Sequence, residues 1–202
     1  MPAPRTLAAA IAPVAAALGV NAVPAAAVFG AGAPLETTMV LYFLENLVIV
    51  VLIALLVRLL APAHDETSPN HRTRRSLLST YLTVALGFTL VNGVFIAVFV
   101  GLFLDVTIPR ATLVGGAALI ALFAVVGSIV GVWRRPLTLA VAEKMLEQTL
   151  GRVFLLHLAV FVGVFLAAVV GSWFVWPFIV LKSITDVGQA VQRLRDVELP
   201  AV

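Results

Sequence analysis

The 202-residue chain contains no cysteine and few charged residues. The absence of cysteine excludes disulfides, iron–sulfur clusters and thiolate-bound metal ions. Only 11% of the residues are charged, whereas a soluble domain carries about 25%. The net charge is only +3, and the basic residues are dispersed along the chain, which excludes nucleic acid as an expected partner. The composition is therefore typical of an integral membrane protein.

What the chain has in abundance is long apolar runs, and 62% of its residues are hydrophobic. About 20 apolar residues are needed for a helix to cross the hydrocarbon core, and six runs meet that length. They lie at residues 7–30, 36–61, 77–104, 111–133, 152–171 and 173–191. Membrane-spanning strands would be shorter and would alternate apolar with polar residues. We predict an all-α, polytopic transmembrane bundle of six helices, forming a single domain over residues 1–202.

The basic residues predict the orientation of the bundle. They precede the first run and fill the links after the second, fourth and sixth runs. Those links and flanks contain Arg5, Arg72, Arg74, Arg75, Arg134, Arg135, Lys144, Arg152, Arg193 and Arg195. The other links contain only Arg110, in the same link as Asp105. Because positive charge gathers on the cytoplasmic side, we expect both termini to be cytoplasmic.

Two segments admit more than one interpretation. The first run also resembles a cleavable signal peptide, because it has Arg5, an alanine-rich core and the stretch 25–27. Asn21 and Pro24 interrupt it late, which is more typical of a packed helix. Residues 137–150 place apolar and acidic side chains on different helical faces. We expect this segment to be a short amphipathic helix on the cytoplasmic interface, serving as an anchor or as a docking site.

Polar residues inside the apolar runs are the candidates for function. A charged side chain at the centre of a membrane helix costs about 2.5–3.5 kcal/mol, so it usually has a partner or a role. We expect Asn21, Glu45, Asn46, Asn92 and Lys182 in an outer-to-central layer. A deeper layer would contain His157 and Asp186, with Arg152 at its rim.

The spacing of these residues predicts polar faces that point into the bundle. Tyr42, Glu45 and Asn46 are spaced i, i+3, i+4 and share one side of a helix. Lys182 and Asp186 are four residues apart and also share a side. We predict that Lys182 bridges Glu45 or Asp186, and that His157 pairs with Asp186. Binding and purely structural roles remain alternatives for this set.

No cofactor or metal ion is expected. His157 is the single histidine in the apolar runs, whereas a b-type haem commonly needs two axial ligands, and the thiolate alternative is absent. The sequence also lacks a Walker loop, a Gly-x-Ser-x-Gly elbow and a His-Glu-x-x-His motif. The motifs of common soluble enzyme classes are therefore missing.

Four sequence blocks resemble those of a widespread prokaryotic family of multi-pass membrane proteins with a domain of unknown function. They are Asn21-x-x-Pro24, Tyr42-Phe43-Leu44-Glu45-Asn46, Arg152-Val153-Phe154-Leu155-Leu156-His157 and Lys182-Ser183-Ile184-Thr185-Asp186. Phe43 stands where the family tends to have tryptophan, and Asn92-Gly93 stands where it tends to have His-Gly. The resemblance implies a multi-pass protein of the inner (plasma) membrane of a prokaryote. It implies no activity.

Three functions are compatible with these features. The first is a small carrier or channel for protons, ions or a small polar solute, with the buried polar set as its binding site. The second is a structural or accessory subunit of a membrane assembly. The third is a membrane-embedded enzyme acting on lipid, with His157 and Asp186 as a general base. We expect the lipid bilayer as a partner, together with a small solute, a second copy of the chain or another membrane protein.

Overall fold

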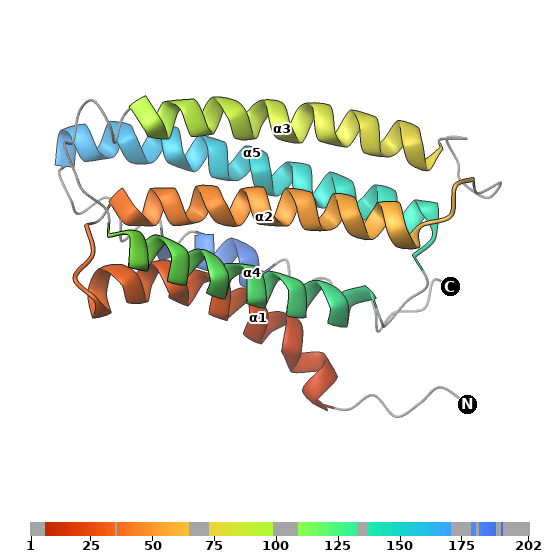
Figure 1. The fold of residues 1–202 in the computed structure, drawn as a ribbon, viewed down its shortest axis with the longest axis horizontal. Helices are drawn as coiled ribbons and strands as arrows, with labels where there is room; N and C mark the ends of the chain where they lie inside the picture. Colours follow the sequence, from red (N-terminus) through yellow and green to blue (C-terminus); the bar gives the residue numbers. More distant parts are fainter. Residues whose placement is uncertain are drawn as a thin grey trace.

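The structure is a computed structural model that describes residues 7–34, 36–64, 73–98, 109–132, 137–170, 179–180, 182–188 and 191. The regular elements of this part of the chain are all helical. They are α1 (Leu7–Ala25), η1 (Ala26–Gly30), α2 (Glu36–Leu60), α3 (Arg74–Val98), α4 (Arg110–Val132) and α5 (Leu139–Val170). Residues 182–188 are also helical. The long helices run side by side along the length of the molecule (Figure 1).

Four of the described helices are long and apolar enough to cross a membrane, which indicates a multi-pass membrane protein. They are α2, α3, residues Arg110–Ile129 of α4 and residues Leu139–Val162 of α5. The ends of α2 and α4 and the starts of α3 and α5 lie at the same end of the bundle, at the right of Figure 1. Successive long helices therefore alternate in direction.

The first predicted run, residues 7–30, is helical throughout but changes type near its end. Pro24 has no backbone N–H, so the carbonyl of Val20 loses its usual partner. The chain then widens into η1, a stretch of π-helix, and the N–H of Ala31 donates to the carbonyl of Ala26 at 3.0 Å. Gly32, with φ of 65°, supports the turn into α2.

The first helix packs closely on α4 through small residues. A Cβ added at Gly19 would come within 2.7 Å of the ring of Phe123, and one at Gly127 would come within 3.0 Å of Ala16. Small residues at such crossings let helix backbones approach, which is how helices associate in lipid. The contact makes α1 part of the bundle and positions Asn21 towards its interior.

One end of the bundle is apolar, and we refer to it as the apolar region. It is built from the second half of α2, the first half of α3 and the first half of α5. Its buried members are Val50, Ile53, Ala54, Val57, Ala61, Leu77, Tyr81, Ala85, Leu137, Leu139, Ala142, Leu146 and Val153. These side chains interlock three helices, and none of the buried members named here is charged.

The structure differs here from the expectation of a separate interfacial helix at residues 137–150. These residues instead begin α5, which continues without a break to Val170. No proline lies between Leu139 and Val170, and Gly151 alone does not end a helix. The apolar face of the segment is covered by α2 and α3, so it packs in the bundle. As a result, Arg152 lies near the middle of a helix and not at a rim.

Some predictions fall outside the described residues. These are the links that carry Arg72, Asp105, Arg134 and Arg135, the flanking residues Arg5, Arg193 and Arg195, and much of the run at 173–191.

Candidate functional site

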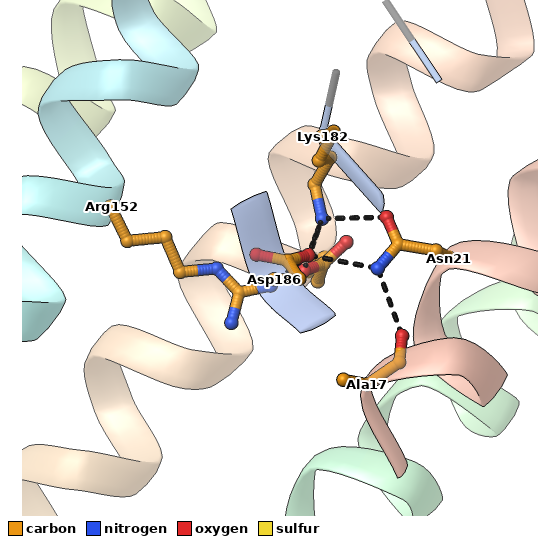
Figure 2. Close-up of polar contacts among 6 residues, drawn as sticks. Ala17, Asn21, Arg152, Lys182 and Asp186 are labelled. Atoms are coloured by element: carbon orange, nitrogen blue, oxygen red, sulfur yellow. Dashed lines mark hydrogen bonds and ion pairs between the residues drawn. The ribbon is translucent and has the colours of Figure 1, made fainter. Parts of the chain in front are cut away.

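Lys182 lies at the centre of a buried polar network, which we define as Asn21, Glu45, Arg152, Lys182 and Asp186. Its Nζ donates to Asp186 Oδ2 at 2.6 Å and to Glu45 Oε1 at 2.9 Å. A third bond reaches Asn21 Oδ1 at 3.2 Å, as Figure 2 shows. Lys182 and Asp186 are four residues apart on one helical turn, so the helix itself brings them together. The predicted bridge from Lys182 therefore exists to both carboxylates.

Arg152 provides a second cation to the same two carboxylates. Its Nη2 bonds Glu45 Oε1 and also lies 3.1 Å from Asp186 Oδ2. In Figure 2, the side chains of Arg152 and Lys182 approach Asp186 from different sides. Each cation thus contacts both carboxylates, and each carboxylate contacts both cations. The four charges sum to zero.

Asn21 connects the first helix to the network. Its Nδ2 donates to Asp186 Oδ2 and to the carbonyl of Ala17, both at 2.8 Å. The same amide accepts from Lys182 through Oδ1. The network therefore joins α1, α2, α5 and the helical residues 182–188, four segments that are distant in sequence.

Burial makes these contacts costly to break. The side chains of Glu45 and Asp186 are only 1% and 4% exposed, whereas those of Lys182 and Arg152 are 10% and 22% exposed. A buried ion pair gains little over an apolar replacement, but removing one member leaves an uncompensated charge. Tyr42, also buried, places its ring 4.6 Å from Lys182 Nζ, a distance typical of a cation–π contact.

A second polar group lies between α2 and α3. Asn46 Nδ2 donates to Thr89 Oγ1 at 3.1 Å, and the Thr89 hydroxyl donates to the carbonyl of Ala85. Asn92 is one turn beyond Thr89 on α3 and is also buried. A Cβ at Gly93 would come within 2.9 Å of the Phe43 ring, so α2 and α3 are close at this level. Asn46 and Asn92 are therefore both buried where α2 and α3 pack together.

His157 does not join the network, and the predicted pair with Asp186 is wrong. Its ring packs edge-on against Phe88 and Phe161, at centroid distances of 5.3 and 4.7 Å. Five residues separate Arg152 from His157, which places them about 140° apart around a helix. Arg152 can therefore face Asp186 only while His157 faces α3. This removes the His–Asp base that an enzyme acting on lipid would need.

The sequence does not indicate the central role of Arg152, because the apolar run at residues 152–171 predicts a helix that begins at this residue, whereas α5 begins at Leu139. The apolar positions of residues 139–150, continuous with those after Gly151, were the available signal for one long helix. Among the described residues, no three His, Asp or Glu side chains gather in a way that would hold a metal ion.

The model of a family of unknown function, DUF6498, matches residues 3–201. The chain belongs to this family. No curated protein and no solved structure matches it. The resemblance to a family of unknown function is thus shown over nearly the whole chain, while the membrane character rests on the helices and not on the family description.

In this DUF6498 chain, the four blocks that carry the resemblance converge in space. Each supplies at least one member of the polar network, namely Asn21, Glu45, Arg152 and the pair Lys182 and Asp186. The blocks are therefore parts of one buried constellation.

Proposed function

We propose that this chain is a small carrier or channel of a prokaryotic inner membrane, moving protons, ions or a small polar solute. In this proposal six helices span the bilayer and both termini are cytoplasmic. Arg58, Arg74 and Arg75 support the orientation, because they flank helix ends at one end of the bundle and basic residues gather on the cytoplasmic side.

The proposal is based on one observation: in the polar network, each carboxylate contacts two cations and each cation contacts two carboxylates. Glu45 and Asp186 each contact Lys182 and Arg152. If a proton or a solute occupies one carboxylate, both cations still have the other carboxylate beside them. The interior can thus pass between two arrangements in which each cation keeps a carboxylate in contact, and a carrier needs such a two-state element to alternate.

The test is flux through purified protein in proteoliposomes. We expect flux of a transported solute in the wild type, and none in Glu45→Gln or Lys182→Met. The double variant Glu45→Gln/Lys182→Met is the decisive one, because it keeps charge balance through Arg152 and Asp186. It should fold stably and still show no flux. Flux equal to wild type in both single variants would contradict the proposal.

A structural or accessory subunit is the second candidate, and one observation favours it. The polar network joins four segments, so it also determines how the helices dock. In that case the balanced double variant should retain the association with a membrane partner during purification from native membranes. Monodisperse protein with no constant partner would count against this candidate.

A further inference from the structure

The hydrogen-bond donors of Lys182 and Asn21 are fully used. Lys182 has three N–H groups, and they bond Glu45, Asp186 and Asn21. The two N–H groups of Asn21 bond Asp186 and the carbonyl of Ala17. Beside the network, the amide nitrogen of Asn46 bonds Thr89. Lys182 and Asn21 therefore have no donor left for a ligand.

Three buried acceptors in this part of the bundle, in contrast, have no donor bonded to them among the described residues. Glu45 Oε2, Asn46 Oδ1 and Asn92 Oδ1 are buried and make no hydrogen bond within the described part of the chain. Their residues are 1%, 3% and 2% exposed. An acceptor buried without a donor costs free energy that native proteins usually avoid. Three such oxygens on neighbouring turns of α2 and α3 indicate a site that a hydrogen-bond donor would complete.

The residues that carry the three oxygens lie within about one turn of one another along the packed helices α2 and α3. Glu45 and Asn46 are consecutive on α2, and the Asn46–Thr89 bond joins that level to α3. Asn92 lies one turn further along α3, and the contact between Gly93 and Phe43 holds the helices together there. Thr37 and Thr38 also have buried hydroxyls without a bond, but they lie two turns away near the start of α2.

Another acceptor-capable atom borders the same level from α5. Nδ1 of His157 is buried and has no hydrogen bond among the described residues. Its ring contacts Phe88, the neighbour of Thr89. The aromatic rings around it provide apolar walls.

Charge balance then restricts the kind of occupant. Glu45 and Asp186 neutralise Arg152 and Lys182, so an added ion of either sign would have no counter-charge in a region of low dielectric. A neutral molecule with several N–H or O–H groups needs no counter-charge, and it can donate to the unbonded acceptors.

We propose that the acceptor site formed by Glu45, Asn46 and Asn92 binds a small neutral solute rich in hydrogen-bond donors. This inference rests on the proposed carrier or channel function, and it specifies the solute class. Simple amides and ureas have the required chemistry, because each amide nitrogen brings two donors and no charge.

The experiment compares three planar molecules of similar size and different charge: urea, guanidinium and nitrate. Proteoliposomes containing the full chain are mixed rapidly with an osmotic gradient of each solute, and the volume recovery is followed by light scattering. We expect urea to enter at least fivefold faster than into protein-free liposomes. Guanidinium and nitrate should enter at the protein-free rate.

Two variants of Asn92 sharpen the test. Asn92→Leu removes the acceptor with little change in size and should return urea entry to the protein-free rate. Asn92→Asp adds one negative charge and should shift selectivity from urea towards guanidinium, an effect that a structural role would not produce. Leu90→Met is the matched control, because Leu90 is an exposed residue on the same helix, and its urea entry should equal wild type.

The possible failures are distinguishable. Entry of guanidinium or nitrate without urea would overturn the neutral-solute inference while leaving the carrier proposal in place. Urea entry unaffected by both Asn92 variants would also overturn it, as would a site filled by water alone with urea at the protein-free rate. No entry of any solute, including ions and protons, would overturn the proposed function together with this inference.

Discussion

The two halves of α2 face very different surroundings. Near its start, Tyr42, Glu45 and Asn46 are buried among ions and amides. In its second half, Val50 and Val57 are buried among apolar side chains of α3 and α5. One helix therefore belongs both to the polar network and to the apolar region.

The comparison shows what each kind of contact contributes in a membrane. Lipid tails are as apolar as leucine, so apolar contacts between helices depend on shape and give little preference for one neighbour over another. A buried charge, by contrast, tolerates few arrangements, because its partner must be within reach. We infer that the apolar region provides packing, whereas the polar network determines which helices meet and in which register.

The largest effect should come from unbalancing the polar network. Glu45→Gln leaves Arg152 and Lys182 with only Asp186, and breaking a buried pair typically costs about 3–5 kcal/mol. We expect a loss of that size in the free energy of unfolding, measured by detergent-titrated unfolding in mixed micelles.

Restoring the balance should recover part of that loss. The double variant Glu45→Gln/Lys182→Met keeps one cation and one carboxylate, so it should be more stable than either single variant. The coupling energy between contacting residues is about 0.5–3 kcal/mol. Strictly additive losses would show that the network does not behave as one unit.

An intermediate effect is expected in the apolar region. Leu146 is buried in the contact of α5 with α2 and α3, and Leu→Ala changes in cores cost about 2–5 kcal/mol. Leu146→Ala should fall near the lower end of that range in the same unfolding assay. Combined with Glu45→Gln, its effect should be additive, because the two sites share no contact. A strong coupling would contradict the division into two regions.

The smallest effect should come from the amide bond beside the network. Asn46→Leu removes the hydrogen bond to Thr89, and such interhelical bonds contribute about 0.6 kcal/mol on average. The unfolding free energy should therefore change by less than about 1 kcal/mol. A loss as large as that of Glu45→Gln would place Asn46 inside the energetic unit of the network.

The convergence of the polar residues was largely predictable from their spacing along the helices and from the free-energy cost of exposing them to lipid. Tyr42, Glu45 and Asn46 share a face, as do Lys182 and Asp186, and lipid exposure would be costly for each. The length of the apolar run predicts the wrong depth for Arg152, because α5 begins at Leu139 and not at residue 152. The partner proposed for His157 was wrong because two residues on one helix cannot face the same neighbour when they are about 140° apart.

The sequence by itself determined that this chain is helical and suited to a membrane, because long apolar runs and periodic polar faces are local properties of the chain. It also marked the residues that need partners, through the cost of burying them. Only the tertiary structure decided which partners they have. Arg152 and Lys182 share Glu45 and Asp186 because four segments distant in sequence pack at one level, and that arrangement depends on three-dimensional geometry that no local pattern encodes.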